Sequence, residues 1–162
     1  MEESSSELLN SRSDCRNCAA NLILAARQRV YIISQKLEPE LYNDREIFQH
    51  LSNIATSNRK ADIRVIAHDT RLAASQGHHL INLAQKLPSF VQIRMTIIRA
   101  HRQFFESWLI VDDHAYMRIR NPAQYEGSFE INNKLETRSY LDRFEEIWEA
   151  CEIDQNTRRL SL

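Results

Sequence analysis

A run of six residues, R-V-Y-I-I-S at positions 29–34, constrains the fold of this chain more than any other stretch. Its apolar side chains do not alternate with polar ones, so both faces of the segment need to be covered. A strand of this kind is typical of the centre of a sheet that carries helices on both sides. The segment therefore predicts an α/β protein built around a central strand.

The rest of the chain predicts helices and strands that alternate around this strand. Helical spacing of apolar residues covers residues 13–27, 45–58, 72–87 and 135–151, and strand patterns cover residues 29–34, 62–67, 91–99, 104–111 and 115–120. The β-α-β-α-β beginning favours parallel strands with right-handed crossovers, and the hairpin at residues 104–120 adds an antiparallel part. We predict an α/β three-layer sandwich in which a mixed five-stranded sheet carries helices on both faces.

Length and composition indicate one domain with two loose ends. A chain of 162 residues that is 43% hydrophobic and 27% charged can bury one core. We place the domain at residues 13–152, between a flexible N-terminal segment at residues 1–12 and a flexible tail at residues 153–162. The acidic, serine-rich start also resembles an interdomain linker, so the alternative is a fragment of a longer protein.

Composition also excludes several classes of protein. Two glycines in the whole chain are too few for a glycine-rich phosphate loop. No run of about 18 apolar residues is present, so we expect no membrane span, and the N-terminus lacks the apolar core of a secretory signal. Three cysteines, an odd number, fit a reducing compartment better than a disulfide framework. These features predict a cytoplasmic protein.

Two of the cysteines form a short motif, C-R-N-C, between Cys15 and Cys18. A zinc site needs about four ligands, and no second C-x-x-C or paired histidine follows at finger spacing. On a helix, residues three apart simply share a face. We therefore expect two structural cysteines, no metal and no cofactor, with a redox or metal-binding pair as the alternative.

Four runs of the sequence carry a resemblance to a known family. They are S-F-V-Q-I-R-M, F-E-S-W-L-I-V-D-D, G-S-F-E-I-N-N and F-E-E-I-W-E-A, which begin at residues 89, 105, 127 and 144. Together they resemble one repeat of the phospholipase D superfamily, over residues 19–151. The chain is more similar to a catalytically degenerate bacterial branch of that superfamily, which is sometimes attached to a GNAT-type acetyltransferase.

The superfamily motif is H-x-K, four residues, then D, with G-S downstream. A His and a Lys two positions apart on a strand point into the same pocket; the His attacks the phosphodiester and the Lys neutralises the phosphate. Asp112 matches the motif's Asp, which places Phe105 at the His position and Ser107 at the Lys position. Gly127–Ser128 matches the G-S only if an insertion is assumed. The resemblance therefore implies a pseudoenzyme with no catalytic residues for phospholipase-type hydrolysis.

The ends of the parallel strands are the place where a ligand would still bind. Open α/β sheets bind ligands outside the carboxyl ends of their strands, and imidazoles and helix N-termini there suit a phosphate. For each histidine, the alternative is a hydrogen bond within the fold. Together with positions matched by the resemblance, the candidate binding residues are Ser34, His68, His79, Arg99, His101, Asp112, Gly127 and Ser128.

Six basic residues predict a second kind of surface. If they line the sheet edge and loops beside Phe104, they form a stripe that binds nucleic acid. The preferred interpretation is an ordinary solvated face, because acidic residues are equally numerous in the chain. The six residues are Arg59, Lys60, Arg64, Arg94, Arg99 and Arg102.

The resemblance also implies partners. In the superfamily the active site lies between two repeats, so a single repeat implies a homodimer, with residues 104–111 and the Gly127 loop at the interface. The aromatic side chains of Phe104, Phe105 and Trp108 would add apolar surface there. An acetyltransferase or another protein is a further partner, nucleic acid is an alternative one, and no membrane is expected.

Two functions follow from these observations. The first is a non-catalytic phospholipase D-like binding or regulatory domain, with a cleft for an anion such as phosphate or for a protein. The alternative is a phosphodiesterase or nuclease whose site has moved to His68, His79 or His101 and nearby arginines. The first is preferred because the motif positions hold neither a nucleophile nor a charge.

Overall fold

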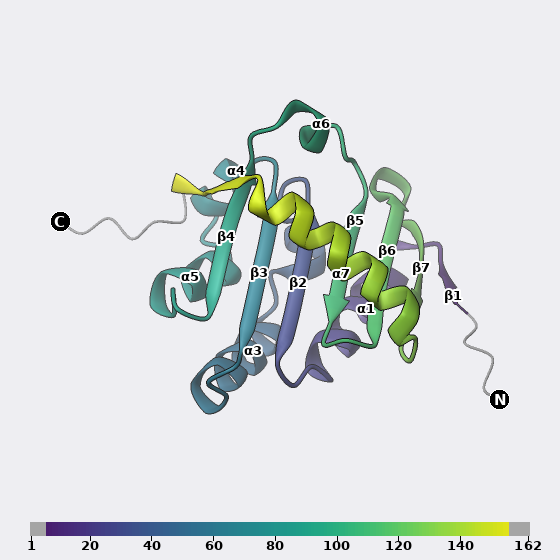
Figure 1. Ribbon diagram of the computed structural model, residues 1–162, viewed down its shortest axis with the longest axis horizontal. Coiled ribbons are helices and arrows are strands. Elements are labelled where there is room, and N and C mark those ends of the chain that lie inside the picture. The colour runs from purple at the N-terminus through teal and green to yellow at the C-terminus, as the bar shows by residue number, and fades with distance from the viewer. Residues whose placement is uncertain (1–5, 156–162) are drawn as a thin grey trace.

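The computed structural model describes residues 6–155, which form one mixed sheet of eight strands (Figure 1). The order of strands across the sheet is β1-β7-β6-β5-β2-β3-β4-β8. Strands β2, β3 and β4 run parallel, and every other neighbouring pair is antiparallel. The strands are β1 Glu7–Leu9, β2 Arg29–Ser34, β3 Asp62–Ala67, β4 Val91–Thr96, β5 Ser107–Val111, β6 Ala115–Asn121, β7 Glu126–Glu130 and β8 Cys151–Ile153.

The predicted α/β class and the mixed sheet are confirmed, whereas the predicted number of five strands is wrong. The three additional strands are β1, β7 and β8, which are only three to five residues long. Segments this short carry little pattern of their own. They form because the edges of a sheet leave backbone N–H and C=O groups that need partners.

The predicted flexible ends extend too far into the chain. Glu7–Leu9 pairs with β7, and Cys151–Ile153 pairs with β4 at the opposite edge of the sheet. Asp154, one residue beyond β8, is fully buried. Both ends therefore contribute to the folded domain, while the parts of the predicted flexible ends at residues 1–5 and 156–162 lie outside the described residues.

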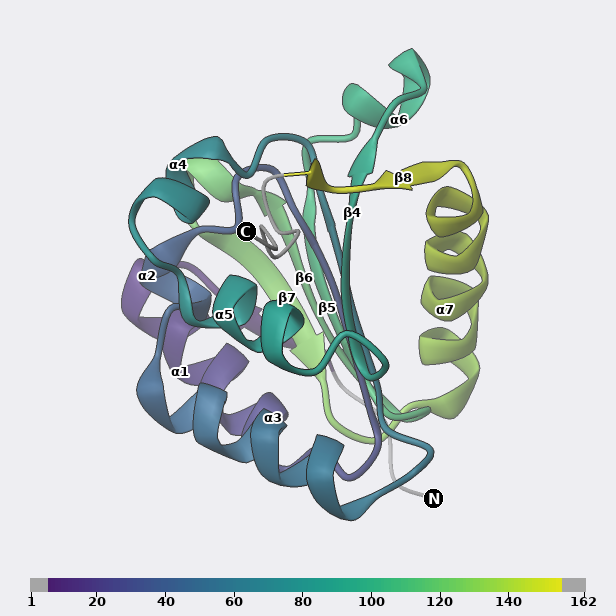
Figure 2. The same ribbon diagram turned by 90° about the vertical axis from the view of Figure 1, so that its left-hand side faces the viewer.

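Helices lie on both faces of the sheet, with α7 on one face and α1, α3 and α5 on the other (Figure 2). Alternate residues of β2 enter two separate apolar clusters. Val30 and Ile32 belong to the cluster of α1, α3 and α5, whereas Tyr31 and Ile33 pack in the cluster of α7. The central strand is thus covered on both sides, as its sequence predicts. The helices are α1 Arg12–Leu24, α2 Pro39–Tyr42, α3 Arg45–Ser57, α4 Arg71–Ser75, α5 His79–Lys86, α6 Arg99–Arg102 and α7 Lys134–Glu149, and the 3-10 turn η1 is Pro122–Gln124.

The helices are short relative to a bilayer. Within residues 6–155, none is both long enough and apolar enough to cross a membrane.

One predicted helix, residues 72–87, is two helices in the structure. α4 ends at Ser75, and Gly77 adopts a left-handed conformation with φ of +70°. The Nδ1 atom of His78 then accepts a hydrogen bond of 3.1 Å from the backbone N–H of Leu80, which caps α5. The break follows from the residue types, because glycine adopts positive φ at little cost.

The buried cap residue His78 makes the stability of the protein depend on pH. Burial, and then the neighbouring His79, lower the pKa of His78 from 6.5 to about 4. In the unfolded chain, His78 therefore binds a proton as the pH falls below 6.5. In the folded protein, it binds that proton only near pH 4. Stability that is present above pH 6.5 is lost as the pH falls toward 4. We expect this group to lower the free energy of unfolding by about 2 kcal/mol between pH 7 and pH 5.

Urea denaturation at several pH values would measure this effect. The control is His78→Asn, because an asparagine side chain can cap the helix without titrating. The difference between the two proteins isolates His78 from the carboxylates that titrate in the same range. Parallel stability profiles for the wild type and the variant would contradict the prediction.

Candidate functional site

Several candidate residues meet at one end of the sheet, where β2 ends and β5 begins. Ser34, the last residue of β2, is fully buried, and its hydroxyl donates to the carboxylate of Glu38. Ile33 pairs with Trp108, so the next position of the antiparallel ladder places Ser34 beside Ser107. Ser107 in turn pairs with Ile119, whose other neighbour is Gly127. Ser34, Ser107 and Gly127 therefore share the same end of the sheet.

The two positions matched to the superfamily's His and Lys lie at this end. Phe105 precedes β5 and leaves 60% of its surface exposed. Ser107 is fully buried, and its hydroxyl has no hydrogen-bond partner within the described part of the chain. A phenyl ring has no lone pair with which to attack phosphorus, and a buried hydroxyl carries no charge to balance a phosphate.

The G-S pair of the resemblance is divided between the two faces of the sheet. Gly127 lies so close to β6 that a Cβ atom added to it would be 2.1 Å from the backbone oxygen of Arg118. Ser128 is buried on the opposite face, because successive residues of a strand point to opposite sides. Gly127 thus permits the close contact between β6 and β7.

Asp112 lies at the other end of the sheet, away from Ser34. It occupies the β5–β6 turn with φ of +52°. Its carboxylate accepts hydrogen bonds from the backbone N–H groups of Arg27, Gln28 and Arg29 at 3.1, 3.0 and 3.0 Å. It therefore fixes the connection between α1 and β2, and the structure does not bring it together with the candidates at the strand ends.

His68 follows β3 and uses both of its ring nitrogens within the fold. Its Nε2 lies 2.7 Å from the backbone oxygen of Phe104, and its Nδ1 lies 2.7 Å from the hydroxyl of Thr96. Because a carbonyl oxygen only accepts, Nε2 carries the proton in this contact. His68 ties the segment between β4 and β5 to the end of β3, which matches the alternative that the sequence left open.

Replacing His68 with alanine should loosen the segment between β4 and β5. The change removes two hydrogen bonds, so we expect the free energy of unfolding to fall by about 1–2 kcal/mol. Amide hydrogen exchange should accelerate across residues 97–106 and change little in β2. His50→Ala is a control, since this histidine makes one ring contact, to the backbone oxygen of Ala26. Unchanged exchange at residues 97–106 in the His68 variant would refute the tethering role.

The remaining histidine and arginine candidates lie on two separate helices. His79 opens α5, and its ring packs against Phe48 of α3 with centroids 5.4 Å apart. Arg99 and His101 belong to α6, which projects beyond the end of the sheet (Figure 2). Arg99 is exposed, whereas the Nδ1 atom of His101 is buried without a partner among the described residues.

The six basic residues do not form one stripe. Arg64 makes ion pairs with Asp62 at 2.9 Å and Glu145 at 3.1 Å. The guanidinium of Arg94 lies 4.2 Å from the centre of the Trp148 ring. Arg59 and Lys60 lie in the turn that leads into β3, at the opposite end of the sheet from α6. Sequence spacing did not reveal the pair with Glu145, because that residue is 81 positions away in the chain.

The paired cysteines are buried thiols. Cys15 and Cys18 face the core from α1, and burial raises the pKa of Cys15 to about 11 and that of Cys18 to about 12. Thiols with such pKa values are poor nucleophiles and poor metal ligands at neutral pH. Among residues 6–155, no group of three or more His, Cys, Asp or Glu side chains is arranged to hold a metal ion.

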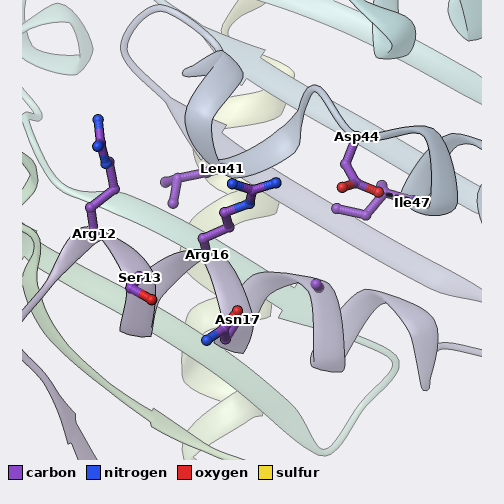
Figure 3. Close-up of a pocket in the computed structure, with 8 residues that line it drawn as sticks. Arg12, Ser13, Arg16, Asn17, Leu41, Asp44 and Ile47 are labelled. Carbon is purple, nitrogen blue, oxygen red and sulfur yellow. Dashed lines mark hydrogen bonds between the residues drawn. The ribbon is translucent and has the colours of Figure 1, made fainter.

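A hollow of about 420 Å³ between α1, α2 and α3 was missed by sequence reasoning (Figure 3). Arg12 and Arg16 reach into it from α1, and neither forms an ion pair within the described part of the chain. The signal in the sequence is that the two arginines are four residues apart, with no acidic residue three or four positions from either. The lining residues are Arg12, Ser13, Arg16, Asn17, Ala20, Leu41, Asp44 and Ile47.

The fold is similar to that of solved proteins with low sequence identity. Nuc from Salmonella typhimurium, a phospholipase D family member, is 12% identical with a TM-score of 0.63, covering 97% of this chain and 100% of that chain. NucT from Helicobacter pylori is 14% identical with a TM-score of 0.61, covering 93% and 99%. The archaeal chromatin protein TrmBL2 is 12% identical with a TM-score of 0.67, covering 92% of this chain and 54% of TrmBL2, so the chain spans about half the length of that protein.

These similarities establish a phospholipase D-like fold. No curated protein matches the sequence. Residues 11–160 match the family model described as a domain of unknown function, DUF7931. Since this match spans most of the 162 residues, the chain belongs to the DUF7931 family.

Proposed function

We propose that this chain is a phospholipase D-like domain that binds a ligand or a protein without hydrolysing a phosphodiester. The observation that carries the proposal is the pair of residues at the matched motif positions, an exposed Phe105 and a fully buried Ser107. Neither side chain supplies the nucleophile or the positive charge that the reaction needs. A fold that keeps its framework without these groups is suited to binding or regulation.

The alternative, a relocated phosphodiesterase or nuclease site, has less support. A histidine that acts as nucleophile or base needs a free ring nitrogen near the substrate. Both ring nitrogens of His68 are occupied by Thr96 and Phe104. The ring of His79 packs against Phe48, and the Nδ1 atom of His101, which has no partner among the described residues, is buried.

A hydrolysis assay tests this proposal directly. The purified protein is incubated with bis(p-nitrophenyl) phosphate and with labelled single-stranded and double-stranded DNA. We expect no turnover above the buffer rate. His68→Ala, His79→Ala and His101→Ala are assayed in parallel. Activity in the wild type that one of these changes abolishes would overturn the proposal and establish the alternative.

The homodimer is also a proposal, and an exposed apolar segment supports it. Phe104 and Trp108 pack against each other with ring centroids 5.0 Å apart, so they do not supply the surface that the sequence suggested. Ile97, Ile98 and Phe105 instead leave 47%, 44% and 60% of their surfaces exposed on either side of α6. We propose that this apolar segment forms the contact between two copies.

The mass of the protein in solution tests the dimer. Light scattering after size-exclusion chromatography should give twice the chain mass for the wild type and the chain mass for Ile98→Ser/Phe105→Ser. Leu135→Ser is the control, because Leu135 is an exposed apolar residue at the start of α7. A wild-type monomer at high concentration would rule out the dimer.

Nucleic acid is a second candidate ligand, and the charge distribution favours it. Residues 71–105 contain no Asp or Glu and five Lys or Arg, although the whole chain has a formal net charge of -1. Arg99 and Arg102 in this stretch are exposed on α6. TrmBL2 is described as binding DNA. Fluorescence anisotropy with labelled oligonucleotides should give binding that weakens steeply with salt and is lost in Arg99→Gln/Arg102→Gln.

An acetyltransferase partner is supported by the resemblance alone. If the domain regulates such an enzyme, the two proteins should co-purify, and adding the domain should change the rate of acetyl transfer. No change in that rate would remove this partner.

A further inference from the structure

We propose that the hollow between α1, α2 and α3 binds a small phosphomonoester through Arg12 and Arg16. This inference rests on the proposed binding function and names a site and a ligand class for it. The hollow is a different site from the matched motif positions. It lies among helices on one face of the sheet, and its lining includes none of Phe105, Ser107 or Asp112.

The positions of the two arginines on α1 argue for an anionic ligand. Residues four apart lie on the same side of a helix, so two positive charges are held near each other, and neither arginine has an acidic residue three or four positions away. Arg12 is also the first residue of α1, where the helix dipole disfavours a cation. Without a ligand, both effects lower the stability of the folded protein. A bound anion would reverse both.

The rest of the lining supports an organic group attached to the anion. Leu41 and Ile47 form an apolar part of the lining, and both are buried. Figure 3 shows Arg12 and Arg16 extending from α1 toward the side on which Leu41 and Asp44 lie. The volume of about 420 Å³ is within the range of small-molecule sites and exceeds what a bare phosphate fills.

The one carboxylate that lines the hollow uses its Oδ1 atom as a helix cap. Asp44 caps α3, and its Oδ1 atom accepts hydrogen bonds from the N–H groups of Glu46 and Ile47 at 2.8 and 3.1 Å. Its negative charge therefore faces the positive end of a helix. The guanidinium groups remain available for a phosphate, which they bind with paired N–H donors.

Isothermal titration calorimetry of the full chain tests this site. The probes are inorganic phosphate, glycerol 3-phosphate and phenyl phosphate, with glycerol and phenol as uncharged controls, all at one ionic strength. Vesicles that contain phosphatidic acid form a further arm, which separates a lipid headgroup from a free phosphomonoester. We expect phenyl phosphate to bind at least tenfold more tightly than inorganic phosphate, because it also contacts Leu41 and Ile47.

Matched variants connect this binding to the hollow. Arg12→Gln and Arg16→Gln should each weaken phosphomonoester binding at least tenfold, and the double variant should abolish it. Arg59→Gln is the control, because Arg59 is exposed, forms no ion pair among the described residues and lies outside the hollow. All three substitutions are on the surface, and circular dichroism checks their folding.

Two results would overturn the inference. One is that no phosphate probe binds the wild-type protein at millimolar concentration. The other is binding that Arg12→Gln/Arg16→Gln leaves intact. Either result would leave the non-catalytic proposal standing, because that proposal is judged by hydrolysis and the dimer by mass.

Discussion

Replacing Asp112 with alanine should lower the free energy of unfolding by about 3 kcal/mol and the melting temperature by roughly 6–12 °C. The carboxylate accepts three backbone hydrogen bonds, from Arg27, Gln28 and Arg29. Each charge-assisted bond contributes more than a neutral one, although water can replace part of the loss because the site is only partly buried. The measurement is urea denaturation followed by circular dichroism.

A second substitution at the same position distinguishes the contributions of the two carboxylate oxygens of Asp112 to stability. Its Oδ1 atom accepts from Gln28 and Arg29, whereas Oδ2 accepts from Arg27. Asparagine can keep the first two bonds and must lose the third, so Asp112→Asn should cost about half as much as Asp112→Ala. Asp113→Ala is the control and should change stability by less than about 0.5 kcal/mol, because its contact with Lys134 is long at 3.9 Å and exposed. Equal effects of the changes at positions 112 and 113 would show that the three bonds are unimportant.

The change Gly127→Ala should destabilise the protein by about 3 kcal/mol or more. The new Cβ atom would lie 2.1 Å from the backbone oxygen of Arg118 and 2.8 Å from the Cα of Ile119. Both neighbours are main-chain atoms of β6, so they cannot move aside as a flexible side chain would. Relief requires β7 to separate from β6, and within residues 6–155 β1 pairs only with β7.

The other glycine provides a matched control. Gly77 has φ of +70°, and an added Cβ atom would meet nothing within 4 Å. Gly77→Ala should therefore cost only the strain of a left-handed residue, about 1–2 kcal/mol. Thermal and urea unfolding of both variants measure the difference. A Gly127 variant that is as stable as the Gly77 variant would mean that β6 and β7 separate without cost.

The roles of these two residues affect how binding experiments should be designed. Asp112 and Gly127 entered the set of candidate binding residues through the resemblance, and the structure gives each a local structural role. Loss of binding in either variant would report unfolding as readily as loss of a contact. Arg12 and Arg16 are better probes, since both are exposed and make no ion pair among the described residues.

Local sequence pattern determined the class of the fold. The unbroken apolar run of β2 indicated a strand covered on both faces, and the structure places helices on both faces of it. The helical spacing in α3 and α7 likewise indicated the correct elements within a few residues. These signals are readable because burial on one face imposes a period of about two or 3.6 residues on the sequence itself. The absence of an H-x-K motif was equally visible, because it concerns residue identity alone.

Only the tertiary structure decided which residues meet. The edge strands β1 and β8 are short, and each forms by pairing with a strand distant in the chain. The same holds for the bond from His68 to Phe104, the three bonds to Asp112 and the hollow that contains Arg12 and Arg16. Each depends on how separate elements pack, and the period of a single segment carries no record of the neighbour that it will contact.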